Sequence, residues 1–139
     1  MGVRGDFEKL KALRGALEGL RSGKVQRRVI RELGRTAHSL VLSGFAAGED
    51  PYGKPWEALR TRKGQPLRDT GRLQNSISFR ASGTGFSLLT SVVYAPFHQE
   101  GTKRIKKRPY FPDERGLPRE WAEEFKEVAD DVIDREVPR

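Results

Sequence analysis

Apolar residues recur every three or four positions in two stretches near the start of the chain, which is the spacing of one helix face. Phe7 and four leucines mark the first stretch and predict a helix over residues 7–20, with Asp6 as its N-terminal cap. Val25, Val29 and Leu33 begin the second stretch, which predicts a helix over residues 24–47 with arginines on its wet side. This second helix would be roughly 36 Å long, so it should serve as a spine or pack on a neighbour.

Residues 48–70 show no period and are rich in glycine, proline and charged residues. A loop of this length is uncommon inside a compact domain and is typically functional. It carries two large aromatic residues, Tyr52 and Trp56, which we therefore expect to belong to a partner or assembly loop. Residues 49–68 are predicted to become ordered on assembly. Trp56 would anchor the loop by burial, either in the chain's own core, which is slightly favoured, or on a neighbour.

Alternation between apolar and polar residues then predicts a β-hairpin, with strands over residues 76–81 and 86–93 and a turn at 83–85. The second strand is apolar on both sides, so it should be the more central one. Residues 109–112, bracketed by prolines, are predicted to form an edge strand, and residues 118–135 a final helix. The fold class is α+β in one domain over residues 1–139, with a helical part (1–47), a long loop (48–70) and a core with a small antiparallel sheet and a C-terminal helix (71–139).

Charge is unevenly distributed along the 139 residues. The net charge is +8, but residues 1–112 carry +13 and residues 113–139 carry −5. A basic body with an acidic last segment suits nucleic acid, an acidic protein surface, or head-to-tail association between copies of the chain. The acidic residues of the last helix, Glu123, Glu124 and Glu127 among them, are expected to face a basic surface of an adjacent subunit.

Few residues suggest a catalytic or metal site. The chain has no cysteine and two histidines, His38 and His98, on different predicted elements. Neither histidine lies in a cluster with the spacing of metal ligands, and no nucleophile elbow or dinucleotide fingerprint is present. No apolar run has the length of a membrane span. We therefore expect no enzyme activity, no cofactor, no metal and no membrane partner.

A dense basic segment lies just before the predicted edge strand. It could hold phosphates together with the neighbouring Tyr110 and Phe111, it could meet an acidic protein surface, or it could be a solvated loop. An acidic protein partner is slightly favoured, because the acidic helix needs a partner. The residues of this basic contact loop are Lys103, Arg104, Lys106 and Lys107.

Four motifs, taken in order over residues 50–112, resemble those of the tailed-bacteriophage virion morphogenesis family, which includes Mu-like morphogenesis proteins and HK97-type neck proteins. They are a G-x-x-W-x-x-L loop, a D-T-G-x-L-x-x-S-I segment, a Y-A-x-x-H-x-x-G turn and an R-P-[FY]-[FL] strand. The matching residues are Gly53, Trp56, Leu59, Asp69, Thr70, Gly71, Leu73, Ser76, Ile77, Tyr94, Ala95, His98, Gly101, Arg108, Pro109, Tyr110 and Phe111.

The resemblance implies structural work rather than catalysis. It implies a subunit of a homo-oligomeric ring, hexamer or dodecamer, in the neck or tail of a phage or phage-like particle, assembled in the bacterial cytoplasm. Partners would be other neck, connector or tail proteins, with genomic DNA in the lumen as a further candidate. A basic nucleic-acid-binding module is the alternative. The family motifs would have structural roles: Asp69 or Thr70 caps a short helix that starts near Gly71, His98 bonds backbone in a turn from Tyr94 to Gly101, and Arg108 and Pro109 belong to the edge strand.

Overall fold

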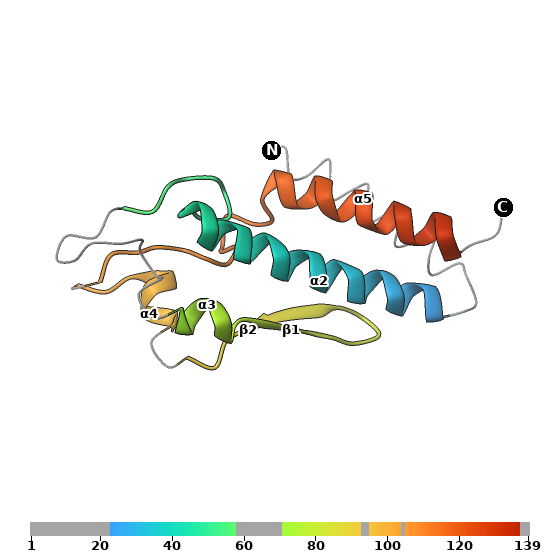
Figure 1. The fold of residues 1–139 in the computed structure, drawn as a ribbon, viewed down its shortest axis with the longest axis horizontal. Helices are drawn as coiled ribbons and strands as arrows, with labels where there is room; N and C mark the ends of the chain where they lie inside the picture. Colours follow the sequence, from blue (N-terminus) through green and yellow to red (C-terminus); the bar gives the residue numbers. More distant parts are fainter. Residues whose placement is uncertain (1–22, 58–70, 93–94, 104, 137–139) are drawn as a thin grey trace.

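A long helix runs through the middle of the molecule in the computed structural model, which describes residues 23–57, 71–92, 95–103 and 105–136. This helix, α2 (Gly23–Ala47), lies between the last helix, α5 (Arg119–Glu136), and a hairpin of β1 (Ser78–Ala81) and β2 (Phe86–Leu89) (Figure 1). Two short helices, α3 (Arg72–Ser76) and α4 (Ala95–Glu100), flank the hairpin in the chain. The α+β class and both long described helices are thus confirmed, whereas the predicted helix over residues 7–20 lies outside the described residues.

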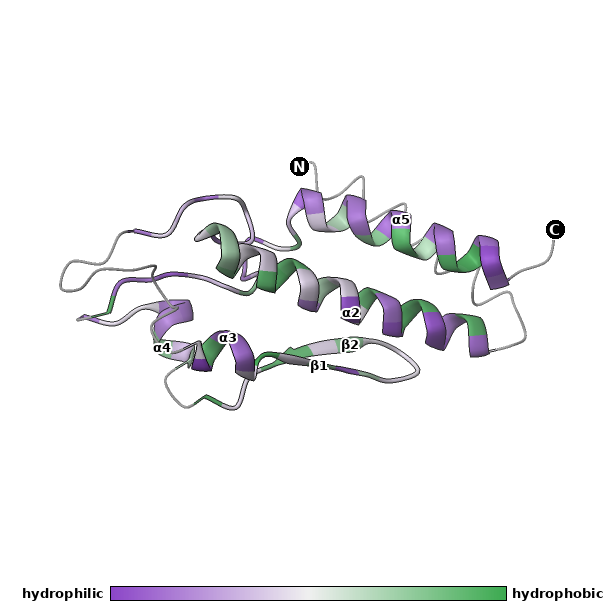
Figure 2. Ribbon diagram, viewed as in Figure 1, coloured by the Kyte–Doolittle hydropathy of each residue, from purple (hydrophilic) through white to green (hydrophobic). Residues whose placement is uncertain are grey.

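Helix α2 forms because its apolar stripe persists over its whole length and buries Val29, Ala37, Val41 and Phe45 (Figure 2). Gly34 is buried on the side facing the hairpin, where a Cβ atom would lie 2.7 Å from Cδ2 of Phe79. A glycine is therefore needed for this close approach of helix and hairpin. The helix ends at Ala47, and the left-handed φ of 73° at Gly48 turns the chain so that the Glu49 N–H donates to the Gly44 carbonyl at 3.0 Å.

Helix α5 packs its apolar face against α2. Trp121, Phe125 and Val132 are buried there, and Ala122 and Ala129 let the two helices come close. Phe125 also meets Phe86 of β2 edge to face, with 5.9 Å between ring centroids. The carbonyl of Pro118 accepts a hydrogen bond from the Ala122 N–H at 3.0 Å, so the proline stands at the start of the helix as predicted.

The hairpin is antiparallel, with Phe79 opposite Leu88 and Ala81 opposite Phe86. Its turn is closed by a hydrogen bond from the Ser82 N–H to the Gly85 carbonyl at 2.8 Å. Within the described residues the sheet has two strands. The expectation that the second strand is the more central one is therefore wrong: β2 ends at Leu89, whose side chain is exposed.

The edge strand predicted over residues 109–112 is also absent from the described structure. The side chain of Gln99, from α4, takes the place of a neighbouring strand. Its Oε1 accepts hydrogen bonds from the N–H groups of Tyr110 (2.9 Å) and Phe111 (3.0 Å), and its Nε2 donates to the Phe111 carbonyl (2.8 Å). One amide side chain thus satisfies three backbone groups of a segment in which Pro109 and Pro112 can donate none.

Candidate assembly surfaces

Trp56 lies in the chain's own core, as the sequence slightly favoured. Its side chain is 8% exposed, its ring meets Phe45 edge to face at 5.3 Å, and its indole N–H donates to the Pro109 carbonyl at 2.7 Å. Phe45 in turn contacts Tyr110, whose hydroxyl donates to the Ala95 carbonyl at 2.8 Å. Burial raises the pKa of Tyr110 to about 12, so its hydroxyl stays protonated and can donate at all physiological pH values.

The side chain of Asp50 stabilises the turn before Trp56 by hydrogen bonds to its backbone. This carboxylate is 5% exposed, and its Oδ1 accepts hydrogen bonds from the N–H groups of Tyr52 and Lys54, both at 2.9 Å. The Trp56 N–H donates to the Gly48 carbonyl at 2.8 Å. Residues 49–57 are therefore a tight, hydrogen-bonded turn, and the ordering of this loop on assembly stays a prediction. Residues 58–70, which complete that predicted loop, lie outside the described residues.

Tyr52 also binds its own chain. Its hydroxyl donates to Oδ1 of Asp113 (3.2 Å) and to the Gly116 carbonyl (2.5 Å), and the guanidinium of Arg115 lies 3.8 Å from its ring centroid. Arg115 also pairs with Asp113 at 2.8 Å, and its hydrogen bonds, more than any other contact, hold the pKa of Asp113 below its usual range. Tyr52 and Trp56 therefore brace residues 48–57 against residues 109–116, and their role in a partner loop stays a prediction.

The family-motif residues have structural positions that differ in part from those expected. Asp69, Thr70 and Tyr94 lie outside the described residues. The N-cap of α3 is Gly71, with a left-handed φ of 71° and no side-chain cap, so the expected cap from Asp69 or Thr70 is not what the described residues show. Residues 95–100 form helix α4 rather than a simple turn.

His98, Gly101, Arg108 and Pro109 gather where α4 meets the segment that follows the basic loop. The His98 carbonyl accepts the Arg108 N–H at 2.8 Å, and the Arg108 Nε donates to the Glu57 carbonyl at 2.9 Å. Gly101 adopts a φ of 79°, and a Cβ there would lie 3.0 Å from the backbone of Lys107. Burial, and secondly the charge of Arg108, lowers the pKa of His98. These motif residues fasten the two ends of the basic loop together.

The basic contact loop is compact. The Thr102 N–H donates to the Ile105 carbonyl at 2.8 Å, and the Ile105 N–H donates to Oγ1 of Thr102 at 2.9 Å. Lys103 and Lys107 are exposed, whereas Lys106 makes an ion pair with Glu57 of the same chain at 3.0 Å. Arg104 lies outside the described residues. The loop therefore presents fewer uncommitted charges than the sequence suggested.

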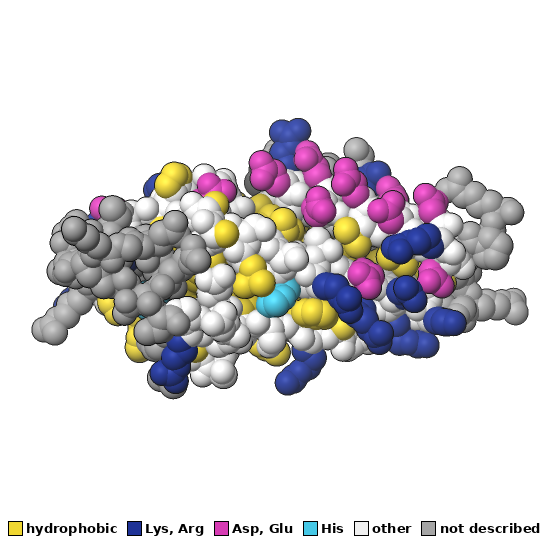
Figure 3. Space-filling model, viewed as in Figure 1, with side chains coloured by type: hydrophobic (Ala, Val, Ile, Leu, Met, Phe, Trp, Pro, Cys, Tyr) yellow, Lys and Arg dark blue, Asp and Glu magenta, His cyan; other side chains and the backbone are white. Residues whose placement is uncertain are grey.

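The acidic residues of α5 lie on the side opposite its buried face. Glu123, Glu124 and Glu127 are all exposed, as are Glu120 and Asp131. Two of the carboxylates have partners on the same helix: Arg119 pairs with Glu123 and Lys126 with Asp130. Figure 3 shows these acidic side chains as a continuous row along α5. This row is the clearest acidic surface that the described residues form.

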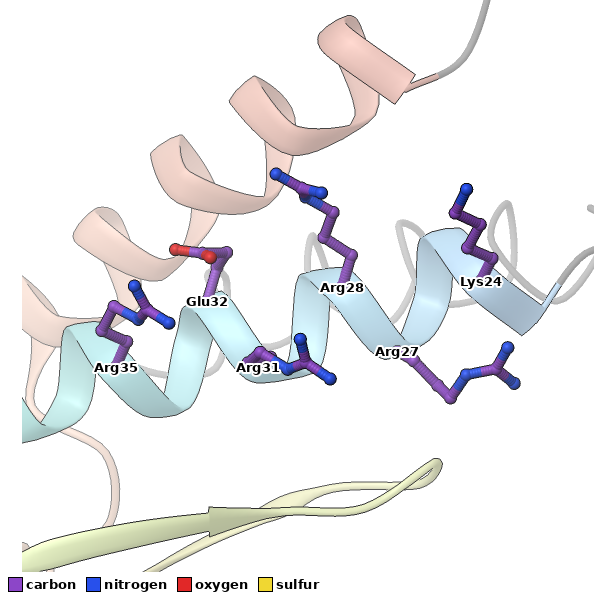
Figure 4. A pocket seen from close by; sticks show the side chains of 6 residues that line it. All are labelled: Lys24, Arg27, Arg28, Arg31, Glu32 and Arg35. Carbon is purple, nitrogen blue, oxygen red and sulfur yellow. The ribbon is translucent and has the colours of Figure 1, made fainter.

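A basic surface on α2 lies beside that acidic row and was not among the predicted site residues (Figure 3). It lines a shallow groove, and Figure 4 shows its side chains fanning out from one face of α2. Arg27, Arg31 and Arg35 repeat every four residues, so the signal was present in the sequence but was interpreted as a solvated face. We call this set the α2 basic face: Lys24, Arg27, Arg28, Arg31 and Arg35.

Neither a metal site nor a membrane helix is found in the described part of the chain. Across residues 23–57, 71–92, 95–103 and 105–136, no group of three or more histidine, aspartate or glutamate side chains could hold a metal ion. Among those same residues, no helix combines the length and apolar character needed to cross a bilayer. The notable chemistry of the described surface is therefore its separated charge.

Comparison with known proteins decides the family. The sequence model of the phage virion morphogenesis family matches residues 8–132, which include five of the six described elements in full and most of α5. The chain belongs to the phage virion morphogenesis family. This confirms the family that the four sequence motifs indicated, and it extends the match beyond them to α2 and α5. Family membership makes a structural role in virion assembly the general function of the chain.

A curated relative agrees with this assignment. The chain is similar to the Mu-like prophage FluMu G protein 2 of Haemophilus influenzae, with 33% identity over 94 residues. The aligned region covers 67% of this chain and 66% of the relative, just under two thirds of that protein's length. No solved structure matches the chain, so the surfaces are interpreted from this chain's own residues.

Proposed function

We propose that the chain is a structural subunit of the head–tail connection or of the tail-completion ring of a phage or phage-like particle. It would act by symmetric self-association and by docking to neighbouring neck, connector or tail proteins. The observation that carries the proposal is the separation of charge on a member of a virion assembly family: an acidic row on α5 and a basic face on α2. Such a subunit needs no catalysis and no cofactor.

Separated faces of opposite charge favour a heterologous contact, in which one face of a subunit meets a different face of the next. Contacts of this kind close into a ring when the rotation between neighbours allows it. Exposed charge pairs each contribute only about 0.2–1 kcal/mol. They would therefore set register and partner choice more than affinity, and a ring of six or twelve subunits would repeat them at every interface.

The basic contact loop has two possible partners within this role. If it faces the lumen, Lys103 and Lys107 would attract genomic DNA without regard to sequence and in a salt-dependent way. If it faces a neighbouring protein, it would meet carboxylates. Lys106 already pairs with Glu57 of the same chain at 3.0 Å, so Lys103 and Lys107 are the described charges of the loop that either partner would meet.

Replacement of the loop's charges separates these cases. Gln at Lys103, Arg104, Lys106 and Lys107 should weaken the empty ring if the loop meets protein, and should impair DNA retention with intact rings if it meets DNA. Arg108 is left unchanged because its side chain holds the Glu57 carbonyl. Normal assembly and normal infectivity of the quadruple variant would show a merely solvated loop.

The proposed function is tested by removing the protein from particle assembly. Particles made without this gene product should accumulate as separate heads and tails or as tails of abnormal length, and the wild-type protein supplied in trans should restore joined particles. A variant with a disrupted core, Phe45→Asp, is the matched negative control, because Phe45 is fully buried. Normal particles without the gene product would contradict the proposal.

A further inference from the structure

Repulsion between the like charges of the α2 basic face should destabilise an isolated subunit. Arg27, Arg31 and Arg35 stand four residues apart, so their Cα atoms are separated by about 6 Å along the helix axis. Like charges at this spacing destabilise a helix. The described residues provide no ion-pair partner for Arg31 or Arg35, and both are exposed. Such a row persists in a protein more readily when a partner neutralises it.

One member of the face shows which chemistry fits. Nε of Arg28 pairs with Oε1 of Glu136 at the end of α5, 3.2 Å away. In Figure 4, Arg28 extends toward α5, while Arg27 extends toward the hairpin and Arg31 and Arg35 lie between. A carboxylate carried by a helix of the α5 type can thus reach a guanidinium of α2. The remaining arginines point elsewhere, where α5 of the same chain does not cover them.

The outer face of α5 has the matching pattern. Glu120 and Glu124 are four residues apart, and so are Glu123, Glu127 and Asp131. The buried residues of α5 lie on its other side, against α2, so this acidic row faces away from its own chain. Rows of side chains four residues apart are the ridges that interdigitate when two helices pack. The acidic ridge of α5 and the basic ridge of α2 therefore have the same repeat and opposite charge.

We propose that the α2 basic face of one subunit docks against the outer acidic face of α5 in a second copy of the chain. This inference rests on the proposed ring-forming function and names the surface that meets the acidic helix. It places that contact on α2 rather than on the basic contact loop, whose Lys106 already pairs with Glu57 of its own chain.

The carboxylates in and beside the groove of the α2 basic face favour a helix of a second copy over DNA as its partner. Glu32 lines the groove of the α2 basic face, and Glu136 lies at its edge in the pair with Arg28. A duplex carries about one negative charge per 1.7 Å of its axis, so it would bring phosphates against these carboxylates and against the acidic row of α5. A helix whose carboxylates occur every four residues can instead align them with the arginines alone.

Reversing two charges on each face tests the proposal. The α2 variant is Arg31→Glu with Arg35→Glu, and the α5 variant is Glu124→Lys with Glu127→Lys. A charge-matched control, Lys54→Glu with Arg80→Glu, changes two exposed basic residues outside both faces and alters the net charge by the same amount as the α2 variant. All variants change exposed side chains, and circular dichroism confirms that each one folds.

Sedimentation of the purified full chain over a range of concentrations measures assembly. We expect each two-residue variant to raise the concentration for half-assembly about tenfold or more, since every interface loses two attractions and gains two repulsions. The chain that carries all four reversals should assemble like the wild type, because attraction is restored with the signs exchanged. The charge-matched control should also assemble like the wild type.

Several results would overturn the inference. Either two-residue variant assembling like the wild type would show that its face is not at the interface. Failure of the fourfold variant to recover would show that the faces do not meet each other. Intact rings that lose binding of a 30-base-pair DNA only in the α2 variant would assign the α2 basic face to DNA. A wild-type chain that stays monomeric at every concentration would refute self-association itself, and with it the proposed function.

Discussion

Replacing Trp56 with phenylalanine should destabilise the fold without removing an assembly contact. The substitution removes the donor of the 2.7 Å hydrogen bond to the Pro109 carbonyl, and Pro109 is buried. A buried carbonyl left without a partner costs about 1–3 kcal/mol, and the lost part of the ring leaves a cavity that costs about 1–2 kcal/mol. The expected loss in the free energy of unfolding is therefore about 2–5 kcal/mol.

Urea unfolding followed by circular dichroism measures this loss, because the helix signal does not depend on the tryptophan removed. A thermal melt should show a fall in Tm of roughly 10 °C, since a chain of this size loses about 3–4 °C per kcal/mol. Trp121→Phe is the matched control. Trp121 is 5% exposed and contacts Phe125, but none of the described residues accepts a hydrogen bond from its indole N–H, so only the cavity term should apply.

The difference between the two variants in the free energy of unfolding tests this interpretation. Trp56→Phe should cost about 1–3 kcal/mol more than Trp121→Phe, and at a temperature where both are folded it should assemble like the wild type. An equal or smaller cost at Trp56 would refute the view that this residue braces residues 48–57 against the Pro109 segment. Loss of assembly in a fully folded Trp56→Phe variant would show that Trp56 belongs to a partner surface.

Three further predictions concern single residues. Gly34→Ala should destabilise the protein by about 1–2 kcal/mol, because the new Cβ would overlap Phe79 at 2.7 Å and this overpacking outweighs the gain of about 1 kcal/mol in helix propensity. The control Ser39→Ala, on the exposed side of α2, should be neutral or stabilising. A stabilised Gly34→Ala variant in the same urea titration would contradict the close packing of α2 on Phe79. Gln99→Leu should cost about 2–4 kcal/mol, since three backbone groups lose their partner, whereas Gln99→Glu, which keeps an oxygen to accept the Tyr110 and Phe111 N–H groups and loses only the donor to the Phe111 carbonyl, should cost less; equal costs would argue against the described pairing. Burial lowers the pKa of His98 in the folded state. The contribution of His98 to stability should therefore be complete above its unfolded pKa of about 6.5 and decline as pH falls toward its folded pKa. A His98→Gln variant should lack that decline in melts between pH 7 and 5, and an unchanged pH profile would contradict the burial of His98.

The two long described helices were predictable because their apolar residues keep helical spacing over many turns. The hairpin was predictable for a similar reason, since Gly83 and Gly85 stand between two alternating stretches. The strand over residues 109–112 was predicted wrongly because its backbone partner is the side chain of Gln99. Local patterning cannot reveal that a glutamine 11 and 12 residues earlier will satisfy these N–H groups.

The acidic surface on α5 could be predicted from the sequence. The carboxylates of α5 follow one helix face, so their shared exposure could be derived from their spacing. The contacts of Tyr52 and Trp56 with residues 109–116 could not be predicted, because that segment lies far along the chain; their assignment to a partner loop stays a prediction. The α2 basic face was visible as a four-residue repeat of arginines, but its meaning depends on α5 lying beside it.

Electron microscopy of the assembled particle, with this subunit located, tests the central claim most directly. A fusion at the C-terminus that carries a recognisable density would mark its position, and symmetric averaging would give the number of copies. The account predicts a closed ring at the head–tail junction or at the upper end of the tail, with α5 of each subunit against α2 of the next. Absence of the subunit from finished particles, or its presence there as scattered single copies, would contradict it.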